Sequence, residues 1–232
     1  MDLELKFSKN ELSRIGILDI YIKRKIKHYF SNNLKINQKI QLKIINDWKN
    51  KKSINSADEL NNWLSLYEIT YNEWIELINS DYVWTAWCLK KFENNLSNYF
   101  SIRKEYLDKF YYSIIKVKNK ELADEFYIRI KEEESSFEEI ANQYPEVIDQ
   151  KSKIKIGPVS ISEVETLIAS LIKVGKKYQL WKPKLFNGMW FIVRLDNILN
   201  AELDQNLKIK LSLELGDKFL EEKFIEIQKN KI

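Results

Sequence analysis

The period of the hydrophobic pattern changes near residue 110, and this change constrains the fold more than any other feature of the sequence. Up to about residue 108, apolar residues recur every three or four positions, which is the spacing of an amphipathic helix. Residues 110–117 instead form a run of aromatic and β-branched residues, which is typical of a β-strand. A helical region followed by a mixed region predicts an α+β architecture.

The helical region contains a repeated start signal, a Ser or Thr followed three residues later by Glu. This capping box pairs N–H groups that a helix N-terminus leaves free. It occurs at Ser8, Ser56 and Thr70. We expect the first helix to continue to about Phe30, and a separate long helix to begin near Asp81. The tryptophans of this region recur at helical spacing and predict packing between helices; they are Trp48, Trp63, Trp74, Trp84 and Trp87.

The mixed region is expected to follow the order β-α-α-β-α-β-β up to about Asp196. Its closing strand, residues 186–195 with the sequence FNGMWFIVRL, begins at the turn Asn187-Gly188. Alternate residues of a strand point to opposite faces of the sheet. Met189, Phe191, Val193 and Leu195 therefore share a core face, and Trp190, Ile192 and Arg194 share the other. Residues 201–229 are then expected to form one long helix. Its leucines lie along one face, which must pack against another element to be shielded from water.

The composition excludes several kinds of active site. The chain has one cysteine, Cys88, and one histidine, His28, so neither a disulfide framework nor a multi-cysteine or multi-histidine metal site is available. Cys88 is expected to be a small buried residue inside a helix. The sequence contains no Gly-rich phosphate loop. We therefore expect neither a cofactor nor a metal.

Basic residues concentrate near the start of the chain. Residues 1–52 carry 13 Lys and Arg against 5 Asp and Glu, a net charge of +8, whereas the whole chain has a net charge of +4. The cluster at residues 23–28 fits either a polyanionic partner, such as RNA or a membrane surface, or a solvated helix face. The chain is rich in Lys, Asn and Ile throughout, and no nucleic-acid recognition motif accompanies the cluster. Nucleic acid is therefore not the expected partner.

The sequence shows neither of the usual membrane signals. The first residues lack the positive and apolar regions of a signal peptide. No stretch approaches the roughly 18 consecutive apolar residues of a transmembrane helix. We therefore expect a cytoplasmic protein without a membrane span.

Four segments of the mixed region, taken in order, resemble parvulin-type (PpiC-type) peptidyl-prolyl cis/trans isomerases. They are YYSIIKVKN (111–119), SSFEEIANQY (135–144), IGPVS (156–160) and FNGMWFIVRL. The helical flanks resemble the arrangement of SurA-type chaperones and foldases. The resemblance implies a helical domain at 1–108, an inserted parvulin-like domain with a four-stranded, mainly antiparallel sheet at 109–198, and a C-terminal helix at 199–232 that packs on the helical domain.

The resemblance also implies a site. The histidine positions of the family fall on Ser113 and Trp190, and these are the predicted catalytic residues. The predicted substrate-binding residues are Lys155, Val164, Ile168 and Met189. Cis/trans isomerisation of an Xaa-Pro bond breaks no covalent bond and needs no nucleophile. The rotation barrier of about 18–20 kcal/mol comes from amide resonance, and an apolar pocket can weaken this resonance. The expected partners are extended or unfolded polypeptides that contain Xaa-Pro. The alternative is a non-catalytic peptide-binding chaperone or maturation partner that has lost the histidines.

Overall fold

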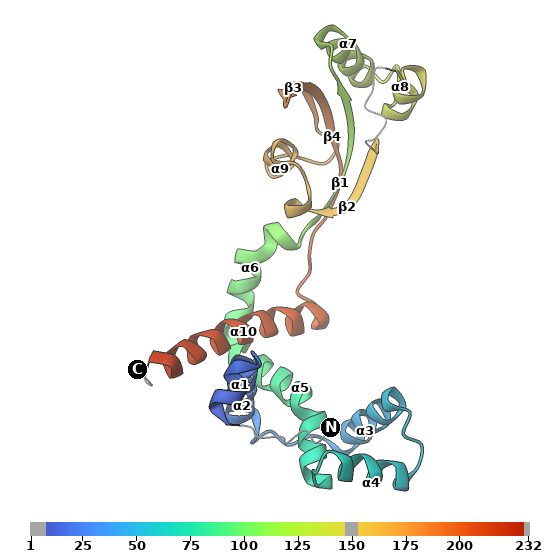
Figure 1. Cartoon of the computed structure of the whole chain (residues 1–232). Coiled ribbons are helices and arrows are strands. Elements are labelled where there is room, and N and C mark those ends of the chain that lie inside the picture. Colours follow the sequence, from blue (N-terminus) through green and yellow to red (C-terminus); the bar gives the residue numbers. More distant parts are fainter. Residues whose placement is uncertain (1–7, 147–152, 230–232) are drawn as a thin grey trace. The chain divides into compact units, whose positions relative to one another are not determined.

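The structure is a computed structural model that describes residues 8–146 and 153–229 (Figure 1). The chain divides into two compact units. The helical unit contains the described residues up to Ser97 and from Leu203 onward, and the sheet unit contains Asn98–Glu202.

The α-helices of the helical unit are α1 (Lys9–Arg14), α2 (Leu18–Ser31), α3 (Gln38–Lys52), α4 (Ala57–Leu66), α5 (Tyr71–Phe92) and α10 (Gln205–Lys229). Of these, α1, α4 and α5 begin at the expected caps Ser8, Ser56 and Thr70. Two expectations were wrong. The first helix breaks at Gly16, whose positive φ of 74° does not fit a helix. In addition, α5 runs without a break from the Thr70 capping box through Asp81, because no Gly or Pro interrupts it.

The C-terminal helix α10 packs on α2 and α5, as predicted. Ile26, Trp84 and Cys88 form one buried cluster with Leu220 and Phe224 of α10. The close approach of α10 requires a glycine, because a Cβ at Gly216 would overlap the Cys88 Sγ. Cys88 is buried, as expected.

A second core in the helical unit joins α3, α4 and α5. Its buried residues are Ile54, Leu60, Leu64 and Trp74. Trp48 lies between two other tryptophans, with ring centroids 4.9 Å from Trp63 and 5.2 Å from Trp74. Trp84 and Trp87 stack in the first core, 4.9 Å apart. The tryptophans therefore hold helices together, as their spacing predicts.

The sheet unit has the predicted order of elements. These are α6 (Leu96–Leu107), which straddles the boundary, β1 (Lys109–Val117), α7 (Lys120–Lys131), α8 (Phe137–Gln143), β2 (Lys155–Ser160), α9 (Thr166–Ile172), β3 (Leu180–Phe186) and β4 (Met189–Leu199). The strands form one antiparallel sheet in the order β2-β1-β4-β3. The predicted α+β fold, with its inserted four-stranded sheet, is confirmed.

Helices cover both faces of this sheet (Figure 1). The face toward α9, called the α9 face, buries Ile114, Phe191, Val193 and Leu195 against Ile168 and Ile172. The face toward α7 and α8, called the α7–α8 face, buries Ile115, Val117 and Ile192 against Phe126, Ile130, Phe137 and Ile140. The alternation predicted for the closing strand is thus present, and both of its faces are core. Among the described residues, no helix combines the length and apolarity needed to cross a membrane.

Candidate functional site

The predicted site residues lie on both faces of the sheet. Trp190 packs on the α7–α8 face. Ser113 shares that face, because it alternates with Tyr112 and Ile114 of the opposite core. The predicted substrate-binding residues Val164, Ile168 and Met189 instead belong to the α9 face. The sheet separates these two groups, so the predicted residues do not line one groove.

The Ser113 hydroxyl is part of a buried polar network. Ser113 is fully buried, and its Oγ donates to Asp196 Oδ2 at 2.6 Å. Arg194 Nε donates to the other oxygen, Oδ1, at 2.7 Å. The guanidinium of Arg194 also lies 5.1 Å from the centroid of the Phe137 ring. Ser113 therefore ties β1 to β4, and its proton is already engaged with a carboxylate.

Lys155 and Trp190 also make contacts on this side of the sheet. Lys155 forms an ion pair with Glu138 of α8. Burial opposes the ionisation of Glu138, but the hydrogen bond and charge of Lys155, aided by Arg194, outweigh it and lower the pKa of Glu138. Trp190 is half-buried, with the Lys120 Nζ 5.7 Å from its ring. These contacts join the helices α7 and α8 to the sheet.

The α9 face gathers the remaining predicted residues around an aromatic pair. Val164 and Met189 are half-buried beside Phe191, whose ring lies 5.8 Å from that of Phe186. Lys116 lies at the same place, with its Nζ 4.9 Å from the Phe191 ring centroid. This arrangement is a partly accessible apolar surface with a cation beside it.

Charged groups near this surface are paired. Lys116 Nζ donates to Glu165 Oε1 at 2.5 Å. Tyr112 is buried beneath them, and burial, followed by the charge of Glu165, raises the pKa of its phenol to about 12. The phenol is therefore neutral at physiological pH. Val164 and Met189 are thus partly accessible apolar residues of the α9 face, near the Lys116–Glu165 ion pair, whereas the Tyr112 side chain is buried.

A shift of one residue in both strand alignments changes the site. It moves the positions of the family histidines from Ser113 and Trp190 to Ile114 and Phe191, because a slip of one residue moves every side chain to the opposite face. Ile114 and Phe191 share the α9 face with Met189 and are both buried. Met189 alternates in phase with Phe191 and not with Trp190.

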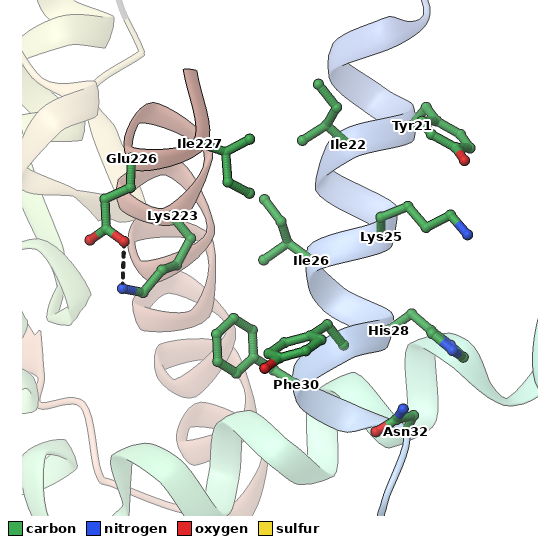
Figure 2. Close-up of a pocket in the computed structure, with 11 residues that line it drawn as sticks. Tyr21, Ile22, Lys25, Ile26, His28, Phe30, Asn32, Lys223, Glu226 and Ile227 are labelled. Carbon is green, nitrogen blue, oxygen red and sulfur yellow. Dashed lines mark hydrogen bonds and ion pairs between the residues drawn. The ribbon is translucent and has the colours of Figure 1, made fainter. Parts of the chain in front are cut away.

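The helical unit contains a pocket that sequence reasoning missed. It has a volume of about 640 Å³ and lies between α2 and α10. Figure 2 shows Ile22 and Ile26 of α2 pointing toward Ile227 of α10. Its apolar lining is completed by Phe30 and Tyr29, and its polar lining consists of Tyr21, Lys25, His28, Asn32, Lys223 and Glu226. We call it the α2–α10 pocket.

Several apolar and aromatic side chains of α2, α10 and the segment after α1 are exposed. Tyr29 is 74% exposed, and Ile15 and Ile20 are more than half exposed. Tyr21 and Ile225 are also exposed.

A second pocket of about 1260 Å³ lies among α2, α3, α4 and α5. It shares Tyr21, Lys25, His28 and Asn32 with the first pocket, so the two adjoin. Its apolar lining comprises Leu34, Ile36, Trp48, Trp63, Tyr67, Ile69, Leu77, Ile78 and Val83. We call it the α2–α5 pocket.

Comparisons with known proteins find similarity to solved structures only. No protein-family model matches the sequence, and no curated protein matches it significantly. The matching structures include the peptidylprolyl isomerase PrsA from Bacillus cereus, with 18% identity, a TM-score of 0.45 and coverage of 96% of this chain and 84% of that one. The foldase protein PrsA from Streptococcus pneumoniae matches with 15% identity, a TM-score of 0.40 and coverage of 97% and 88%.

A third match is a SurA-like chaperone from Campylobacter jejuni. It has 15% identity, a TM-score of 0.37 and coverage of 97% of this chain and 92% of that one. These matches extend over nearly the whole chain at low identity. They are proteins of the kind that the sequence motifs predicted.

The structure offers no cluster suited to a metal. Among residues 8–146 and 153–229, no group of three His, Cys, Asp or Glu side chains is placed to hold an ion.

Proposed function

We propose that this chain is a foldase-like chaperone that binds extended, unfolded polypeptides through its helical unit. The observation that supports this most directly is the α2–α10 pocket, with its apolar lining and its exposed aromatic residues Tyr21 and Tyr29. Its volume of about 640 Å³ falls within the range of about 300–1,000 Å³ that is usual for ligand pockets.

The chemistry of the pocket fits a polypeptide. An apolar side chain that enters between Ile22 and Ile227 leaves water, and full burial of such a side chain stabilises a complex by about 1.5–3 kcal/mol. The lining also carries Lys25 and Lys223, of which Lys223 donates to Glu226 at 2.7 Å. Two lysines beside an apolar pocket favour client segments in which acidic residues flank a large apolar one.

The binding test compares two forms of one client. A reduced and carboxymethylated protein, which cannot refold, is titrated with the full chain, and the disulfide-intact protein serves as the control. We expect saturable binding of the unfolded form and none of the native form. Equal binding of both forms, or of neither, would contradict the proposal.

A second candidate function is isomerisation of Xaa-Pro bonds on the α9 face. The observation that favours it is the gathering of Val164, Ile168 and Met189 around Phe191 on one face. An apolar surface of this kind binds the twisted amide, which has less charge separation than the planar one. Catalysis requires that preference for the twisted state. Ser113 and Trp190 pack on the opposite face of the sheet. The proposed isomerisation is therefore assigned to the α9 face alone.

A further inference from the structure

Helix α3 of the helical unit has an outer face that is open to water. Its five residues lie at positions i, i+3, i+4, i+7 and i+11, and all are exposed: Lys39, Leu42, Lys43, Asn46 and Asn50. Leu42 is 55% exposed. The opposite side of the helix lines the α2–α5 pocket through Gln41, Trp48 and Lys52. We call the outer face the α3 basic face.

The cations of the α3 basic face are unpaired. Lys39 and Lys43 precede and follow Leu42, and neither has an ion-pair partner among residues 8–146 and 153–229. The whole of α3 carries five lysines and one aspartate, so the rest of the helix also favours an acidic partner. A partner that fits this face is therefore acidic and also covers an apolar side chain.

Helix α7 of the sheet unit has a face with the same spacing and the opposite charge. Its five residues, which end at the C-cap, are all exposed: Glu121, Asp124, Glu125, Ile128 and Glu132. Ile128 is 55% exposed, the same fraction as Leu42. The opposite side of α7 is buried against the sheet through Ala123, Phe126 and Ile130. We call the exposed face the α7 acidic face.

Nearby cations do not neutralise the α7 acidic face. Ion pairs with neighbouring residues of the chain engage Glu125 and Glu132, toward the C-terminal end. Lys120 lies over an aromatic ring of β4. Glu121 and Asp124 have no ion-pair partner in the described part of the chain. The N-terminal half of this face therefore presents two carboxylates without a cation.

We propose that the α3 basic face of one copy of this chain docks on the α7 acidic face of a second copy. Both faces extend over eleven residue steps, or about 16 Å of helix, so they match in length. Contact brings lysines of the first against carboxylates of the second, which fixes the orientation of the two copies. It also removes Leu42 and Ile128 from water together.

The apolar residue in each face favours a second copy over nucleic acid. Nucleic acid would bind the lysines through its phosphates, but it would leave Leu42 exposed. The α7 acidic face offers both the carboxylates and an exposed aliphatic side chain at helical spacing. No residue of the α3 basic face lines the α2–α10 or the α2–α5 pocket. The inference is therefore independent of the proposed function.

The size of the two faces predicts a weak and reversible association. Two single helix faces bury less than the roughly 1,600 Å² of a standard protein–protein interface. Exposed charges are also screened by salt, because the Debye length falls from about 10 Å at 0.1 M to about 3 Å at 1 M. We therefore expect association that depends on both protein concentration and ionic strength.

The first measurement is sedimentation equilibrium of the full chain between about 10 µM and 1 mM, the range in which weak complexes dissociate. In about 0.1 M salt, the average mass should rise with protein concentration. In about 1 M salt the same rise should need at least tenfold more protein. A chain that keeps the mass of one copy at every concentration and salt would overturn the proposal.

Two charge-reversed variants then identify the faces. Lys39→Glu/Lys43→Glu reverses the α3 basic face, and Glu121→Lys/Asp124→Lys reverses the α7 acidic face. Each variant alone should associate at least tenfold more weakly than the wild type. An equal mixture of the two should associate again, because the unchanged α7 acidic face of the first variant meets the unchanged α3 basic face of the second.

A third variant controls for net charge. Lys208→Glu/Lys210→Glu changes the net charge as much as the α3 variant does, at two exposed lysines of α10. It should associate like the wild type. All of the substituted residues are exposed, so the variants should fold, and their unfolding transitions verify this.

Several outcomes would overturn the proposal. Equal loss of association in the Lys208→Glu/Lys210→Glu variant would assign the effect to net charge. A mixture of the α3 and α7 variants that stays dissociated would exclude a contact between these two faces. A wild-type chain that stays monomeric but binds a single-stranded oligonucleotide through Lys39 and Lys43 would assign the α3 basic face to nucleic acid.

Discussion

Ser113 Oγ donates a 2.6 Å hydrogen bond to Asp196 in the buried layer between the sheet and helices α7 and α8. Replacement by alanine leaves one carboxylate oxygen without this partner. We expect Ser113→Ala to lower the free energy of unfolding by about 1–2 kcal/mol, measured by urea denaturation. Polypeptide binding should stay unchanged. Unchanged stability with loss of isomerase activity would instead identify Ser113 as a catalytic residue.

Met189 and Trp190 are adjacent residues on opposite faces of the sheet, and they distinguish the two possible sites. If the α9 face carries the isomerase, Met189→Ala should reduce the acceleration of an Xaa-Pro peptide several-fold, and Trp190→Ala should not. The measurement is protease-coupled isomerisation, with both variants checked for equal stability. The second candidate function fails if the wild-type chain does not accelerate the reaction.

Gly216 allows α10 to approach Cys88 closely, and this contact predicts a specific coupling. Gly216→Ala introduces a methyl group that overlaps the sulfur atom, which should destabilise the helical unit by about 1–3 kcal/mol. Cys88→Ala removes that sulfur. In a double-mutant cycle, the double variant should therefore be less destabilised than the sum of the two single changes. Additive effects would contradict the close packing.

Burial, together with the charge of Asp217 and against an opposing effect of Lys27, raises the pKa of the Cys88 thiol to about 12. The unfolded thiol ionises near pH 8.5. Above that pH the unfolded state binds fewer protons than the folded state, so stability falls as pH rises from about 8.5 toward 12. We expect a thiol reagent at pH 8 to label the native chain slowly and the urea-unfolded chain at once. Rapid labelling of the native chain would contradict the burial.

Local signals account for most of what the sequence predicts correctly. Ser56 and Thr70 begin helices because their side chains accept hydrogen bonds from N–H groups within a few residues. The closing strand alternates because period 2 is a property of the strand itself. The break at Gly16 and the continuity of α5 at Asp81 depend on details that the hydrophobic pattern does not report.

The sites depend on residues that are distant in the sequence, and this is why they were harder to predict. The α2–α10 pocket exists only where Ile22 and Ile227 face each other. The hydrogen bond between Asn79 and Gln41, which line the α2–α5 pocket, joins residues 38 positions apart in the chain. In the sheet, a difference of one residue in the alignment of β4 moves the predicted site between Trp190 and Phe191, which lie on opposite faces.

The account depends above all on the α2–α10 pocket as a client site, and two matched tyrosines test it most directly. Tyr29 is exposed, lines the pocket and contacts Phe30, with ring centroids 5.1 Å apart. Tyr71 is also exposed, does not line either pocket, and contacts Trp74 at 5.2 Å. Each is replaced by alanine, and the affinity for reduced, carboxymethylated protein is measured by fluorescence anisotropy.

We predict that Tyr29→Ala weakens the binding of the unfolded protein by about three- to tenfold, since it removes apolar area worth roughly 1 kcal/mol. Tyr71→Ala should bind like the wild type, and both variants should have the wild-type unfolding transition. Equal affinities for Tyr29→Ala, Tyr71→Ala and the wild type would contradict the central claim that unfolded polypeptides bind at this pocket.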